Sequence, residues 1–180
     1  SSSIEPSSSQ SSLTPRHLVA PPYEKLGFWE QVSTPEFLLY IMFGSFSLAK
    51  FSFYLGSLRL QLIEITGSES NALPWLSLFS LLFPIGAIAD FPVGMLIDRW
   101  GIGVSFHVLV VVSVLQSICS LIPNAPLQIA TFVLFAIFRA ILFTAQANFF
   151  SALFGFKSFG RLLAIPTIVG GLLSTLQYPI

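Results

Sequence analysis

LPWLSLFSLLFPIGAIADFPVGMLIDRWGIGVSFHVLVVVSVLQSICSLI, residues 73–122, contains two long apolar stretches separated by a short polar break at 98–101. A transmembrane helix needs about 20 consecutive, mostly apolar residues. The stretches 73–97 and 102–122 each meet that requirement. This part of the sequence therefore predicts two membrane-spanning helices joined by a tight turn. The other apolar stretches of the chain are interpreted in the same way.

The composition of the whole chain agrees with a membrane environment. Its 180 residues are 54% hydrophobic and 9% charged, with a mean hydropathy of +0.82. Soluble domains carry charges at about 25% of their positions. Because the net charge is zero, the chain has no excess of basic residues that would indicate nucleic-acid binding. Its single cysteine excludes a disulfide framework and a cysteine-based zinc site. The composition argues against a soluble enzyme, and no motif for a metal, an ATP site or another cofactor occurs.

Five apolar stretches lead to an all-α integral membrane protein. We expect transmembrane helices at about 36–63, 73–97, 102–122, 127–154 and 162–180. Residues 1–22 are rich in serine and are expected to form a flexible linker. Residues 23–35 mix aromatic and charged side chains, as is typical of the membrane–water interface. Pro84 and Pro92 lie inside the second span and are expected to kink it.

The positive charges near the ends of the spans predict an orientation. Cations occur before the first span (Arg16 and Lys25), after the second (Arg99) and after the fourth (Lys157 and Arg161). The loops after spans one and three carry none. Because cytoplasmic loops are enriched in lysine and arginine, the N-terminal segment is expected to be cytoplasmic. The membrane itself could be the plasma membrane, the vacuolar membrane or another endomembrane.

The polar break carries a motif with a recognisable spacing. Gly94, Asp98, Arg99 and Gly101 follow the pattern Gly-x-x-x-Asp-Arg-x-Gly, in which the glycines permit close helix approach and the charged pair can cap helix ends. This motif resembles the signature loop of the major facilitator superfamily, which lies between helices two and three and recurs between helices eight and nine. With a serine-rich stretch before the first span, the resemblance implies that the five spans correspond to helices seven to eleven. The chain would then be incomplete and would lack the N-terminal half of the transporter.

Three shorter segments resemble one family within this superfamily. Residues 53–58 (FYLGSL), 159–162 (FGRL) and 176–179 (LQYP) are similar to the solute carrier 43 family and its fungal relatives. That family consists of sodium-independent transporters of large neutral amino acids. The resemblance therefore implies a facilitative amino acid transporter.

Lys50 is a cation near the middle of the first span. A charge at the centre of a bilayer costs about 2.5–3.5 kcal/mol on insertion scales, so such a residue usually faces a cavity or a partner. Ser47, Lys50, Tyr54 and Ser57 are spaced by three, four and three residues and share one helix face. This polar stripe could line a solute pathway and attract a carboxylate. The alternative is a structural ion pair.

A second cation, Arg139, lies in the middle of the fourth span. Phe135, Phe143 and Gln146 lie on its face by the same periodicity, and aromatic rings around a polar group suit a pocket for an apolar side chain. Alternatively, Arg139 snorkels or binds a backbone carbonyl. In the family that the chain resembles, helices seven and ten line the central cavity, which would put Lys50 and Arg139 beside the substrate path. Asp90, near the end of the second span, is expected to have an intramembrane pairing role.

We therefore expect part of a facilitative transporter that moves neutral amino acids by alternating access. Its partners would be the lipid bilayer, the small solute and the missing half of the same transporter. The alternatives are a transporter of another solute, such as a monocarboxylate or a sugar, and a membrane scaffold or sensor without transport activity.

Overall fold

The computed structural model describes residues 21–176, and the regular secondary structure within that range is all helical. The end of the predicted fifth span, at 177–180, and nearly all of the predicted linker, at 1–20, lie outside the described residues. The elements are α1 (Phe28–Val32), α2 (Pro35–Thr66), α3 (Glu69–Ile85), a 3₁₀ turn η2 (Gly86–Ala89), α4 (Asp90–Trp100), α5 (Ile102–Leu121), α6 (Ala125–Phe154) and α7 (Phe159–Thr175).

The helices match the predicted spans closely. Helix α2, the continuous path from α3 to α4, α5 and α6 are each long and apolar enough to cross a membrane. Helix α7 is also apolar, and its 17 residues extend roughly 26 Å at 1.5 Å per residue. The chain therefore has the all-α fold and the helices of a multi-pass membrane protein, as predicted.

Helix ends follow from local sequence. The Thr34 side chain accepts a hydrogen bond from the Phe37 amide, and Pro35 occupies the first turn of α2. Gly67, with φ of 75°, ends α2 in the left-handed conformation that glycine adopts without strain. The predicted kink in the second span is a 3₁₀ turn at 86–89, between Pro84 and Pro92.

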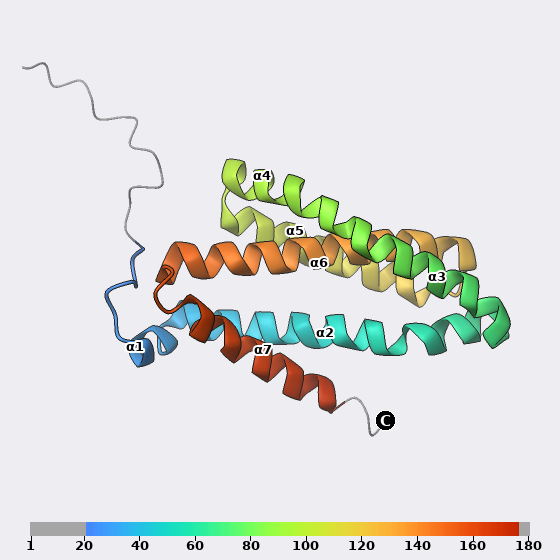
Figure 1. The fold of residues 1–180 in the computed structure, drawn as a ribbon, viewed down its shortest axis with the longest axis horizontal. Helices are drawn as coiled ribbons and strands as arrows, with labels where there is room; N and C mark the ends of the chain where they lie inside the picture. The colour runs from blue at the N-terminus through green and yellow to red at the C-terminus, as the bar shows by residue number, and fades with distance from the viewer. Residues whose placement is uncertain (1–20, 177–180) are drawn as a thin grey trace, which may run out of the picture.

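Helix α6 is the centre of the bundle. Half of its most apolar stretch is buried, compared with 17–28% for the other three long spans. Figure 1 shows α2 and α6 running alongside one another, with the α3–α4 path on one side of α6 and α7 crossing against α2. The outer helices keep many large apolar side chains exposed, which is the surface expected toward lipid or further helices.

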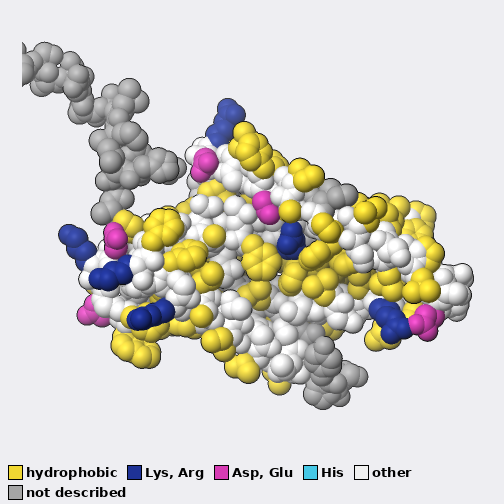
Figure 2. Space-filling model, viewed as in Figure 1, with side chains coloured by type: hydrophobic (Ala, Val, Ile, Leu, Met, Phe, Trp, Pro, Cys, Tyr) yellow, Lys and Arg dark blue, Asp and Glu magenta, His cyan; other side chains and the backbone are white. Residues whose placement is uncertain are grey.

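The connections alternate between the two ends of the bundle. At one end, the Tyr23 amide donates to the Leu153 carbonyl (3.0 Å), and Tyr40 of α2 stacks on Phe149 of α6. Figure 1 places the α4–α5 reversal at this same end. At the other end, Arg59 and Glu69 form an ion pair. The cation-bearing connections therefore gather at one end, as the charge pattern predicted. Figure 2 shows charged side chains at both ends of this face, with a cation and an acidic side chain also near its middle.

Candidate functional site

Lys50 is partly buried, and neutral oxygens of another helix hold its ammonium group. Its Nζ donates to the backbone carbonyl and to the hydroxyl of Ser113 on α5, both at 2.6 Å. The ammonium also lies 5.2 Å from the centre of the Phe138 ring on α6. Within residues 21–176 no carboxylate lies within ion-pair distance of Lys50, so a structural ion pair is not formed there. The positive charge is solvated by the protein without being neutralised.

The rest of the Lys50 face also points into the bundle. Ser47 is buried. Tyr54 packs on Phe135 with ring centroids 4.4 Å apart, and its buried hydroxyl has no hydrogen-bond partner among the described residues. Ser57 donates to the Phe53 carbonyl of its own helix at 2.8 Å. The predicted stripe therefore faces inward through Tyr54, with Lys50 and Tyr54 contacting α3, α5 and α6, whereas Ser57 is only partly buried.

Arg139 is held by an aromatic ring of α3. Its guanidinium carbon lies 4.8 Å from the centre of the Phe83 ring. Its Nε is buried and has no hydrogen-bond partner in the described part of the chain. No hydrogen bond joins Arg139 to a backbone carbonyl within residues 21–176, and the choice between a site role and snorkelling stays a prediction.

The three other residues predicted beside Arg139 have different surroundings. Phe135 is 1% exposed and stacks on Phe51 at 5.2 Å. Gln146 is also buried, whereas Phe143 is 43% exposed and touches Phe51 edge to face. The predicted stripe is therefore interrupted at Phe143, whereas Phe135 and Gln146, at its two ends, belong to the packed interior.

One aromatic cluster connects the two cations. Phe138 lies under Lys50 and Phe83 lies under Arg139, and both rings lie 6.4 Å from the Phe135 ring. We call these five residues the cation–aromatic cluster. A desolvated cation–π contact is worth about 2 kcal/mol, and it leaves the charge available to an anion. The cluster can therefore attract a carboxylate and offer ring faces to an apolar or planar group.

Sequence reasoning missed three contact residues of these cations. Phe83 and Phe138 were two of many phenylalanines, and Ser113 was a single serine in an apolar helix. Only the adjacency of Phe138 to Arg139 could have drawn attention to it. Each partner comes from another helix than the cation it contacts, so helix periodicity could not pair them.

Asp90 begins α4, one helical turn after Gly86. Gly86 packs tightly on α6, since a Cβ added there would lie 2.9 Å from the Cβ of Ala136. Arg139 lies one turn beyond Ala136. Even so, Asp90 makes no ion pair within residues 21–176, and its pairing role stays a prediction.

The predicted signature loop is a one-residue connection. Gly101, with φ of 86°, separates α4 from α5, and its amide donates to the Ile97 carbonyl at 2.8 Å. Asp98 and Arg99 are exposed, and neither side chain makes a hydrogen bond or ion pair with the described residues. The expected capping is therefore absent. Around Gly94 the surface is open, because an added Cβ would meet nothing within 4 Å.

Sequence comparison finds two related proteins. Protein FMP42 of Saccharomyces cerevisiae is 24% identical over 151 residues, which cover 83% of this chain and 30% of that protein. Equilibrative nucleobase transporter 1 of Bos taurus is 34% identical over 64 residues, 36% of this chain and 13% of that protein. This chain spans less than a third of either relative. No family model and no solved structure matches the chain.

Proposed function

We propose that this chain is part of a membrane transporter for a small solute, and that the solute is a neutral amino acid. The observation that carries the proposal is the cation–aromatic cluster, in which two mid-span cations from facing helices share one set of rings. Similarity to a protein named as a transporter supports the general function. A scaffold has little use for two uncompensated charges at this depth, because each is costly in a bilayer.

The chemistry of the cluster suits an amino acid. Lys50 and Arg139 attract the carboxylate, and the faces of Phe83 and Phe138 contact an apolar side chain. We further propose that a second set of helices, as in the major facilitator fold that the sequence resembles, completes the path. Substrate would then lie near the midplane between two halves that rock against each other.

A nucleobase is the second candidate substrate, because the bovine relative is named as a nucleobase transporter. Planar bases stack well on aromatic rings. A neutral base needs no cation, however, whereas a carboxylate does. The dependence of uptake on Lys50 and Arg139 therefore separates the two candidates.

The test is uptake of labelled leucine and labelled adenine by cells expressing the full-length protein that carries this chain. Lys50→Met and Arg139→Gln should each lower leucine uptake at least tenfold, with surface expression within twofold of the unmodified protein. Lys50→Met removes a charge whose insertion costs about 2.5–3.5 kcal/mol, so loss of folding is not the expected result. Arg59→Gln is the matched control. Arg59 lies on α2, like Lys50, but it is an exposed cation near the end of that helix and pairs with Glu69 of α3.

Three results would count against the proposal. Full leucine uptake by both variants removes the cluster from the pathway. Adenine uptake that both variants retain, without leucine uptake, favours the nucleobase. Absence of uptake of either compound by a well-expressed protein argues for a different solute or for no transport activity.

A further inference from the structure

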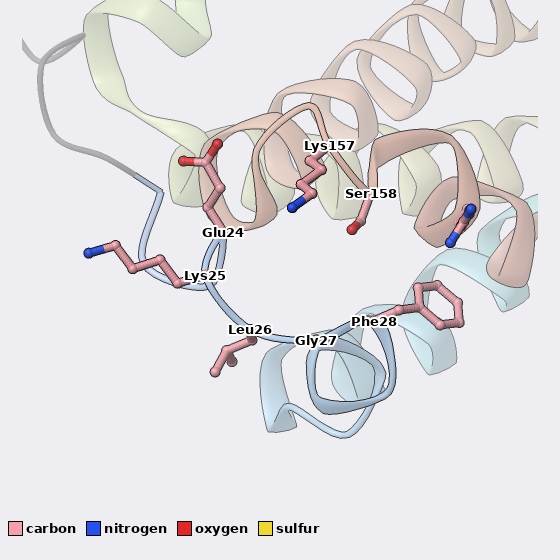
Figure 3. A pocket seen from close by; sticks show the side chains of 8 residues that line it. Glu24, Lys25, Leu26, Gly27, Phe28, Lys157 and Ser158 are labelled. Atoms are coloured by element: carbon pink, nitrogen blue, oxygen red, sulfur yellow. The ribbon is translucent and has the colours of Figure 1, made fainter.

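A cavity of about 580 Å³ lies at the bundle end that carries the N-terminal segment, away from the cation–aromatic cluster. It is open to the surroundings on one side and is lined by the segment before α1, the connection between α6 and α7, and the first turn of α7 (Figure 3). Its lining residues are Glu24, Lys25, Leu26, Gly27, Phe28, Lys157, Ser158 and Arg161.

The lining is basic. Lys157 and Arg161 contribute two positive charges, while Glu24 and Lys25, of opposite charge, line the cavity with side chains that Figure 3 shows extending away from it. No carboxylate in the described part of the chain lies within 4.0 Å of any of these cations. Glu24 instead packs over Gly155, where an added Cβ would lie 3.2 Å from its carboxyl carbon. The cations are therefore free to bind an anion.

The remaining donors at the cavity also suit an anion. The Ser158 hydroxyl lines the cavity, and Figure 3 shows it pointing into the space beside Lys157. Ser158 precedes α7, a 17-residue helix whose first-turn amides and dipole favour negative charge. Lysine, arginine and hydroxyl donors together match the oxygens of a phosphate group.

The surroundings of this cavity suit a position at the level of lipid headgroups. Trp29 and Phe156, adjacent in sequence to lining residues on either side, are 77% and 81% exposed. Large exposed aromatic rings at the end of a transmembrane bundle are typical of the membrane–water interface. Basic pockets between helices at this level bind anionic headgroups.

We propose that this cavity binds the headgroup of an anionic phospholipid. The lipid phosphate contacts Lys157, Ser158 and Arg161, and the acyl chains pass along the apolar surface of the bundle. The bound headgroup would tie the N-terminal segment to the start of α7. This site is independent of the substrate proposed above and lies at a separate place in the fold.

The test is lipid binding by the purified full chain in phosphatidylcholine nanodiscs, followed by tryptophan fluorescence and by native mass spectrometry. Titration with dioctanoyl phosphatidylserine should give saturable binding. The double variant Lys157→Gln, Arg161→Gln should weaken it at least tenfold. The charge-retaining variant Lys157→Arg, Arg161→Lys should stay within threefold, which separates loss of charge from loss of shape. Arg99→Gln is the control, because Arg99 is an exposed cation at the same end but outside the cavity.

Other outcomes would overturn the assignment. Equal binding by the unmodified protein and the Lys157→Gln, Arg161→Gln variant shows that the cavity is not the site. Equal binding of dioctanoyl phosphatidylcholine shows that no anionic headgroup is selected. Inorganic phosphate that binds as tightly as the lipid assigns the cavity to a soluble anion instead. Circular dichroism of each variant checks that its helices are intact.

Discussion

Gly170 offers the sharpest test of how α7 packs on α2. A Cβ built at Gly170 would lie 2.8 Å from the Cβ of Leu48 and 3.3 Å from the Ser45 carbonyl oxygen. Neither atom can swing away, since one is attached directly to the backbone and the other belongs to it. Gly171 is the matched control, because a Cβ there meets nothing within 4 Å.

The expected magnitude follows from this geometry. For Gly170→Ala, the Cβ–Cβ distance must grow from 2.8 Å to at least 3.4 Å, so the helices must separate locally by about 0.6 Å. A gap of that size forfeits a quarter to a half of the dispersion energy of the contacts it opens. Overpacking of this kind costs about 1–3 kcal/mol. Alanine also stabilises a helix by about 1 kcal/mol relative to glycine through its higher helix propensity. That gain applies equally at Gly170 and Gly171.

The difference between the two variants therefore isolates the packing effect. We expect the free energy of unfolding of Gly170→Ala to be about 1–3 kcal/mol lower than that of Gly171→Ala. The assay is equilibrium unfolding of the full chain in mixed detergent micelles, followed by circular dichroism. A difference below about 0.5 kcal/mol between the variants would refute the close approach of α7 and α2.

Two further predictions concern the packed interior and the interfacial segment. Phe135→Leu should lower the free energy of unfolding by about 1–3 kcal/mol in the same assay, because ring contacts worth about 0.5–1.5 kcal/mol each are lost. Phe46→Leu, at a site 73% exposed, should change it by less than about 0.5 kcal/mol, and equal effects would contradict the buried position of Phe135. Interaction with the Glu36 carboxylate is the main cause that raises the pKa of the Tyr23 phenol, so this interaction stabilises the fold at neutral pH and weakens as the pH rises through the raised pKa. In a spectrophotometric titration, with Tyr23→Phe identifying the signal, Glu36→Gln should return the pKa of Tyr23 toward its ordinary value, and an unchanged titration would exclude the contact.

The sequence predicted the helices to within a few residues at most ends. The first span was expected at about 36–63 and is Pro35–Thr66, and the fourth was expected at about 127–154 and is Ala125–Phe154. Such accuracy has a physical cause. In a bilayer the backbone N–H and C=O groups must form hydrogen bonds within their own segment. An apolar stretch of this length therefore folds as a helix.

The candidate site was predictable only in part. Lys50 and Arg139 were evident because a cation in an apolar run is costly and conspicuous. Ser113 and Phe83 were not, because a serine or a phenylalanine is unremarkable in such a helix. The different surroundings of Phe135 and Phe143 also depend on the way α6 crosses its neighbours.

The sequence by itself thus determined that this chain is a set of apolar helices, where they begin and end, and that its cation-bearing connections lie together at one end. These properties depend on local hydropathy, proline, glycine and charge. Only the tertiary structure decided that Lys50 and Arg139 share one aromatic cluster, and that Lys157, Ser158 and Arg161 line one cavity with the segment before α1. When a helix is apolar on nearly every face, its sequence periodicity does not indicate which face packs against other helices. Lipid tails and the protein interior are equally apolar, so neither selects one face.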